Sequence, residues 1–123
     1  MKILFILLVF LVNFSQTSNA YFKLSKLVEL DDPWGASFLN DKELIITEKG
    51  GAIKILSLNS NNVKKIEHKL NVLEHGQGGL LDILYKDNFI YVSYTQNRGD
   101  WKSSTSIAKA KLNTKELKFK NIF

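Results

Sequence analysis

One short segment, residues 75–82 (HGQGGLLD), combines residue types that could contact a ligand. His75 offers a titratable ring nitrogen, and Gln77 offers an amide that both donates and accepts hydrogen bonds. Gly76 and the two glycines after Gln77 let the backbone turn tightly and approach a ligand closely. The segment lacks the Lys-Ser/Thr pair of a phosphate-binding loop and leads into a strand-like pattern. An alternative interpretation remains open, in which it is a glycine-rich turn carrying a surface His and Gln.

Few other residues suggest a site. Two His and no Cys cannot build a closed zinc site, and no Gly-x-Ser-x-Gly motif supports a hydrolase triad. His68 lies among lysines on an expected outer strand, so its side chain is predicted to be solvated. Asp31 and Asp32 could bind a cation or begin the turn at Pro33, and the turn is the favoured interpretation.

The elements that would position residues 75–82 are strands. Apolar and polar residues alternate along most of the chain after residue 21, and turn-forming Asn, Asp and Gly residues separate the alternating segments. No segment keeps a helical period. The pattern therefore predicts an all-β protein, with strands at residues 22–30, 43–47, 52–58, 63–70, 80–85, 89–94, 105–112 and 117–123.

The expected strands repeat. Residues 39–48 (LNDKELIITE) align with residues 85–94 (YKDNFIYVSY), and residues 53–59 (IKILSLN) align with residues 107–113 (IAKAKLN). A repeat of about 45 residues with four short strands is typical of a propeller blade and favours a propeller over a β-sandwich. The second unit carries additional residues at 95–104, which contain Arg98, Asp100 and Trp101 and could reach over a substrate or form a surface hairpin. The hairpin is favoured.

The repeat also predicts how the chain is organised. We expect residues 35–70 to form one blade and residues 80–123 to form the next. Residues 22–30 would be an additional strand that completes the last blade. Because propellers close with at least four blades, the sequence is predicted to be the N-terminal part of a longer protein.

The first twenty residues predict export. Lys2 precedes an unbroken apolar run at residues 3–12, and small residues at positions 18 and 20 suit cleavage after Ala20. The apolar run is too short to span a bilayer, which disfavours a membrane anchor. We therefore expect a signal peptide at residues 1–20 and a periplasmic or secreted protein that is not stably inserted in the membrane. The net charge of +5 comes from scattered lysines, a pattern that argues against a nucleic-acid partner.

Three segments, DDPWGASFLNDKELIITEKGGAIKIL, HGQGGLLDILY and FIYVSYTQ, resemble the start of the soluble quinoprotein glucose/sorbosone dehydrogenases. The resemblance covers residues 25–123 and is closer to the periplasmic aldose sugar dehydrogenases that depend on pyrroloquinoline quinone (PQQ). It implies a six-bladed β-propeller that holds PQQ and calcium, of which about the first two blades are present. It also implies oxidation of an aldose at C1 to a lactone, with transfer of electrons to an acceptor. Gln77 would lie beside the cofactor and the sugar, with His75 and Gly76 shaping that loop.

The same resemblance places the general-base His and the calcium ligands after Phe123, so it assigns no catalytic or metal-binding residue to this chain. The chain alone is therefore expected to be inactive and unable to bind PQQ and calcium. Two alternatives remain. One is a secreted non-catalytic propeller that binds protein or glycan. The other, a calcium-dependent lactonase-like hydrolase, would need Glu, Asn and Asp ligands that this segment does not show.

Overall fold

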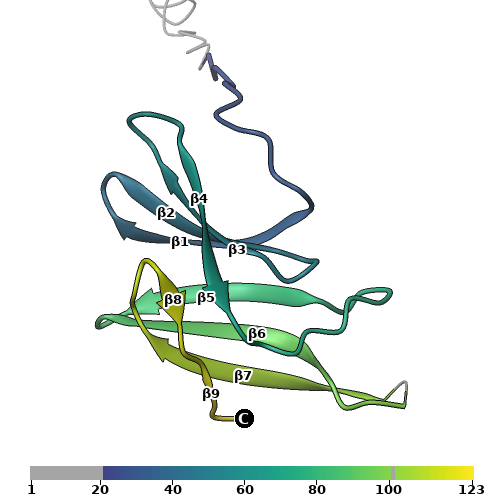
Figure 1. Cartoon of the computed structure of the whole chain (residues 1–123). Helices are drawn as coiled ribbons and strands as arrows, with labels where there is room; N and C mark the ends of the chain where they lie inside the picture. Colours follow the sequence, from purple (N-terminus) through teal and green to yellow (C-terminus); the bar gives the residue numbers. More distant parts are fainter. Residues whose placement is uncertain (1–20, 101) are drawn as a thin grey trace, which may run out of the picture.

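Nine strands in two sheets form the described part of the chain, residues 21–100 and 102–123 of a computed structural model (Figure 1). The predicted all-β class is confirmed, since the described residues contain strands and no helix. It follows that none of these residues belongs to a helix long and apolar enough to cross a membrane. The predicted signal peptide and Trp101 lie outside the described residues.

The first sheet is an antiparallel meander to which one short parallel strand is added. Its order is β1 (Pro33–Asn40), β2 (Glu43–Glu48), β3 (Ile53–Ser57), β4 (Val63–His68) and β8 (Glu116–Leu117). The second sheet is antiparallel throughout, in the order β5 (Leu80–Lys86), β6 (Phe89–Asn97), β7 (Ser103–Lys111) and β9 (Lys120–Asn121). Strands β1 and β2 lie against β5, so the two sheets pack on each other.

The alternation of the sequence explains this packing. Side chains that point from one sheet toward the other are apolar and form a single core. The core consists of Ile45, Ile53, Ile55, Ile66, Leu80, Ile83, Ile90, Val92, Tyr94, Ala108, Ala110 and Leu117. Nine of these twelve side chains are isoleucine, leucine or valine, whose burial accounts for most of the stabilisation available to a chain without cysteines.

The two sheets repeat one local arrangement in their first two strands. In the first sheet, the pairing of β1 with β2 is irregular near Gly35, and the Thr47 hydroxyl accepts the Gly35 N–H at 3.0 Å. In the second sheet, the pairing of β5 with β6 is irregular near Asp82, and the Ser93 hydroxyl accepts the Asp82 N–H at 3.2 Å. Thr47 and Ser93 are aligned with each other in the sequence repeat. In each unit, a side-chain hydroxyl of the second strand thus accepts a backbone N–H at a β-bulge of the first strand.

Two expected strands differ from the structure. Residues 22–30 form no strand, and Phe22 and Leu24 are more than 90% exposed. An alternating pattern becomes a strand only where a partner supplies hydrogen bonds, and no strand of the described chain pairs with these residues. The expected strand at 117–123 is divided into β8 and β9, because the chain first pairs with β4 of one sheet and then with β7 of the other.

Two further segments were incompletely predicted. The strand β1 was missing from the expected set, because Pro33 and Gly35 weaken its alternation. Residues 95–97 extend β6 and residues 103–104 extend β7, so that the two strands form a longer hairpin in which Asn97 pairs with Ser103. The Arg98 N–H donates to the Lys102 carbonyl at 2.9 Å and closes the turn. The described residues of this segment thus form a hairpin, whereas the choice between a surface hairpin and a loop over a substrate stays a prediction.

Candidate functional site

The residues singled out by the sequence lie on the connection from β4 of the first sheet to β5 of the second. Within it, the His75 N–H donates to the Gly78 carbonyl at 3.3 Å, and the Gly78 N–H donates to the His75 carbonyl at 2.8 Å. This pairing encloses a two-residue turn made of Gly76 and Gln77. Gly76 has a φ of 56°, a positive value that glycine adopts more readily than any other residue.

The tip of this turn faces solvent. His75, Gly76 and Gln77 are all exposed, and a Cβ built on Gly76 would meet no atom within 4 Å. The structure therefore brings the three predicted site residues together, with the Gln77 amide and the His75 ring available to a ligand. Their role in a binding site stays a prediction.

The other two glycines of the segment serve packing inside the protein. A Cβ on Gly79 would lie 2.5 Å from the Lys49 carbonyl oxygen, and a Cβ on Gly78 would lie 2.8 Å from Thr95 Oγ1. Neither distance is possible for a real side chain. The close approach predicted for these glycines is thus an approach to neighbouring strands, as in the alternative interpretation of a glycine-rich turn.

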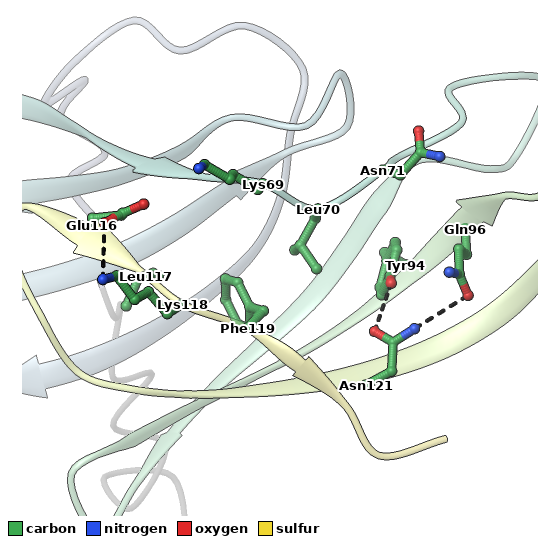
Figure 2. Close-up of a pocket in the computed structure, with 10 residues that line it drawn as sticks. All are labelled: Lys69, Leu70, Asn71, Tyr94, Gln96, Glu116, Leu117, Lys118, Phe119 and Asn121. Atoms are coloured by element: carbon green, nitrogen blue, oxygen red, sulfur yellow. Dashed lines mark hydrogen bonds and ion pairs between the residues drawn. The ribbon is translucent and has the colours of Figure 1, made fainter.

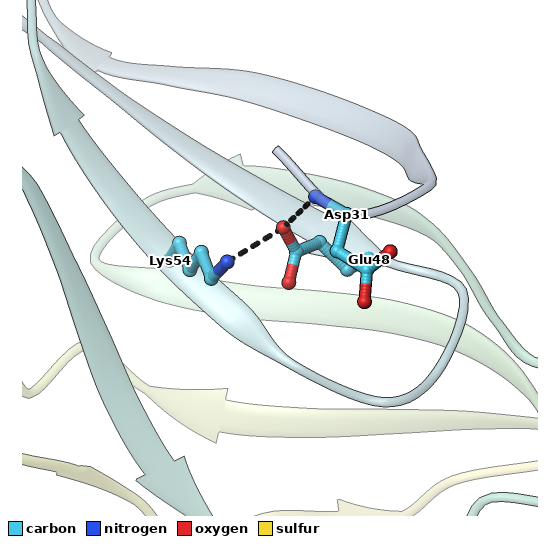
Figure 3. Close-up of polar contacts among 3 residues, drawn as sticks. All are labelled: Asp31, Glu48 and Lys54. Atoms are coloured by element: carbon cyan, nitrogen blue, oxygen red, sulfur yellow. Dashed lines mark hydrogen bonds and ion pairs between the residues drawn. The ribbon is translucent and has the colours of Figure 1, made fainter. Parts of the chain in front are cut away.

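A buried carboxylate at the end of β2 joins the segment before β1 to β3, next to the β2–β3 turn that contacts Gly79. Glu48 is 4% exposed, and its Oε1 accepts the Asp31 N–H at 2.7 Å and the Lys54 ammonium at 2.6 Å (Figure 3). The Lys49 N–H donates to the Asp32 carbonyl at 3.0 Å, and Asp32 itself has a φ of 46°. These contacts agree with the favoured interpretation of Asp31 and Asp32 as a turn at the entrance of β1.

His68 does not have the solvated side chain that the sequence predicted. It is half-buried, its Nε2 lies 2.7 Å from the Gly51 carbonyl, and its Nδ1 accepts the Leu70 N–H at 3.2 Å. Phe119 packs edge-on against the ring, with centroids 6.1 Å apart. Burial lowers the pKa of His68 below its ordinary value of 6.5, so the neutral ring with its proton on Nε2 is favoured. The prediction was wrong because His68 shares a strand face with the fully buried Ile66.

A cavity of about 690 Å³ lies away from the turn, between β4–β8 and the β6–β9 side of the second sheet (Figure 2). The Tyr94 hydroxyl donates to Asn121 Oδ1 at 2.8 Å, and the Asn121 amide donates to Gln96 Oε1 at 3.3 Å. Lys69 and Lys118 are among the residues that line it. No local pattern in the sequence indicates this cavity, because its lining comes from β6, β8, β9 and residues outside strands, which the pairings of β8 with β4 and of β9 with β7 bring together.

Residues 21–100 and 102–123 contain no group of three His, Cys, Asp or Glu residues that could hold a metal ion. The turn offers one amide and one imidazole, which suffice for hydrogen bonds to a hydroxyl or carbonyl group of a ligand. A calcium ion needs six to eight oxygen ligands, so the residues present do not fit a calcium site.

Comparison with known proteins gives a consistent result. The family model for glucose/sorbosone dehydrogenases matches residues 30–123. The aldose sugar dehydrogenase YliI of Escherichia coli (strain K12) is 30% identical over 104 residues, which cover 77% of this chain and 28% of that protein.

Solved structures agree with this match. The soluble aldose sugar dehydrogenase of Escherichia coli in its apo form is similar with a TM-score of 0.69 and 28% identity, over 76% of this chain and 30% of that one. The PQQ-bound aldose sugar dehydrogenase of Streptomyces coelicolor has a TM-score of 0.67 and 20% identity, over 77% of this chain and 30% of that one. At 20% identity, the similarity to the Streptomyces coelicolor structure concerns the fold alone. This chain spans less than a third of the length of each of these relatives.

Proposed function

This chain belongs to the glucose/sorbosone dehydrogenase family, and from that premise we propose that the whole protein oxidises aldose sugars at C1 to lactones with PQQ as its redox cofactor. The observation that carries the proposal is the exposed Gln77 amide on a two-residue turn between the two sheets. The activity is proposed for the whole protein, because this chain spans only 28% of its curated relative. An electron acceptor and calcium belong to the same proposal.

We further propose that the two sheets are successive blades of a six-bladed β-propeller. Each sheet contains a four-stranded antiparallel unit, and the hydroxyl-filled bulge recurs at Thr47 and Ser93. The first strands of the two units, β1 and β5, lie against each other, as inner strands of adjacent blades do. A solved glucose dehydrogenase with a TM-score of 0.70 supports the same arrangement.

The proposed role of Gln77 is to orient a ligand. Its amide can donate to a quinone carbonyl or a sugar hydroxyl oxygen and accept from a sugar hydroxyl hydrogen, which fixes direction as well as distance. His75 and Gly76 shape the turn, and His75 is not proposed as the general base. When bound, PQQ supplies the two-electron acceptor. No residue of this chain is assigned as general base or calcium ligand.

We also propose that the protein is exported to the periplasm or secreted. The apolar run at residues 3–12 and the small residues before position 21 support a signal peptide cleaved after Ala20. N-terminal sequencing of the protein recovered outside the cytoplasm tests this. We expect Tyr21 as the first residue, and an uncleaved Met1 would contradict the proposal.

The activity is tested with the protein expressed from its complete reading frame, loaded with PQQ and calcium, and assayed by aldose-dependent reduction of a redox dye. Gln77→Ala is expected to lower kcat/KM by about tenfold or more, because the orienting amide is lost. Asn59→Ala removes an exposed amide at the opposite end of the first sheet and is the matched control, with no change expected. If Gln77→Ala were as active as Asn59→Ala and the wild type, Gln77 would not belong to the site. Absence of dye reduction by the folded, loaded protein would favour a non-catalytic propeller that binds protein or glycan.

A further inference from the structure

The position of the Gln77 turn depends on residues outside it. A Cβ built on Gly76 would meet no atom within 4 Å, and the His75–Gly78 pairing holds only the turn itself. Its place relative to the sheets must therefore come from the two arms that lead into it, which are residues 71–74 and 78–80. Where these arms are attached determines where the Gln77 amide lies.

Both arms are attached to Thr95, in the part of β6 that extends beyond β5. The Leu73 N–H of the first arm donates to the Thr95 carbonyl at 2.8 Å. On the second arm, the Thr95 N–H donates to the Gly79 carbonyl at 2.8 Å, and the Gly79 N–H donates to Thr95 Oγ1 at 3.2 Å. Thr95 itself is held in the β6–β7 ladder opposite Thr105, so it is a fixed point for the turn.

The side chain of Thr95 contributes what its backbone cannot. Any residue could make the two backbone bonds, but only a side-chain acceptor at this position satisfies the Gly79 N–H. The same side chain packs against Gly78, where a Cβ would lie 2.8 Å from Oγ1 and 3.2 Å from Cγ2. On the other side, the Leu80 N–H donates to the Lys49 carbonyl at 2.9 Å. The second arm is thus held between Thr95 and the β2–β3 turn.

We infer that Thr95 is a positioning residue for Gln77, whose hydroxyl fixes the Gly78–Gly79 arm and thereby aims the Gln77 amide at its ligand. The inference rests on the proposed function of Gln77. It assigns a purpose to the additional length of β6 and β7, which the repeat of the two units does not require. It also assigns Gly78 and Gly79 to the contact with the neighbouring strands and leaves Gln77 as the ligand-facing residue.

The test compares Thr95→Val, Thr95→Ser and Thr105→Val in the whole protein loaded with PQQ and calcium. Thr95→Val keeps the shape and removes the hydroxyl, Thr95→Ser restores the hydroxyl, and Thr105→Val changes an exposed threonine on the paired strand. Amide hydrogen exchange of the peptide covering residues 72–80 measures the attachment of the turn without reference to activity. Dye-coupled sugar oxidation measures its consequence, with kcat and KM determined separately.

For Thr95→Val we expect about fivefold faster exchange of the Gly79 amide and about tenfold lower kcat/KM. Thr95→Ser and Thr105→Val should match the wild type in both measurements. An unchanged exchange rate of the Gly79 amide in Thr95→Val would overturn the inference. So would faster exchange together with an unchanged kcat/KM, when Gln77→Ala does lower kcat/KM. If Gln77→Ala leaves sugar oxidation unchanged, the proposed role of Gln77 fails, whereas the exchange result still shows whether Thr95 holds the turn. Should Thr95→Val not fold, Thr95→Ala gives the same comparison.

Discussion

The hydroxyl of Thr47 joins the two sheets, and its removal gives the sharpest test of how they are held together. Thr47 is fully buried in β2 and accepts the Gly35 N–H of β1 at 3.0 Å. It donates to the carbonyl of Leu81 in β5, across the boundary between the sheets. Leu81 lies in the irregular part of the β5–β6 pairing, between Leu80 and Ile83.

The substitution Thr47→Val keeps the volume and removes both hydrogen bonds. It leaves one N–H and one carbonyl without partners, each at a cost of about 1–3 kcal/mol when buried. Because Gly35 and Leu81 are only half-buried, water can replace part of each bond. We therefore expect the free energy of unfolding to fall by about 2–3 kcal/mol. Thr47→Ser keeps the hydroxyl and loses one buried methyl group, which costs about 1 kcal/mol.

Denaturant unfolding of the purified protein, followed by tryptophan fluorescence, measures both values. Thr114→Val changes an exposed threonine in a loop and should alter the unfolding free energy by less than about 0.5 kcal/mol. If Thr47→Val were no more destabilising than Thr47→Ser, the hydroxyl would not link the sheets, and apolar packing alone would account for their association.

Three other contacts can be tested by substitution. Below pH 6.5 the unfolded chain binds a proton at His68 more readily than the folded chain, so stability should fall as the pH drops, and His68→Gln should remove this part of the pH dependence between pH 7.5 and 5. If urea unfolding gave the same dependence of the unfolding free energy on pH for His68→Gln and the wild type, the burial of His68 would be contradicted. Gly79→Ala should cost about 1–3 kcal/mol through its clash with Lys49, whereas Gly50→Ala, with only a Glu side chain nearby, should be nearly neutral in the same unfolding assay. Glu48→Gln should cost about 1–3 kcal/mol by breaking its buried ion pair, and a double-mutant cycle with Lys54→Met should recover part of that loss; additive costs would argue against the pair.

Much of the fold could be predicted because strand patterns are local. Strands β2, β3, β5 and β7 follow from alternating apolar residues, and turn-forming residues mark most of their ends. Residues 22–30 show the same alternation and yet form no strand, since pairing depends on a partner that a local pattern does not reveal. The division of residues 117–123 into β8 and β9 has the same cause, because it depends on which sheet lies nearby.

The sequence singles out the residues of the proposed site but not the residues that hold them in place. His75, Gly76 and Gln77 could be singled out because glycines, an amide and an imidazole occur together. Thr95 could not, since nothing in its sequence neighbourhood indicates that it meets Gly79 across the sheet. A usable signal did exist for His68, two residues from Ile66 on the same strand face, but the adjacent lysines obscured it.

The most direct test of the central proposal is a PQQ titration of the whole protein in the presence of calcium and an aldose. We predict saturable, sugar-dependent dye reduction that requires PQQ and is lowered about tenfold in kcat/KM by Gln77→Ala. A folded protein that binds no PQQ and reduces no dye at saturating sugar would contradict the proposal.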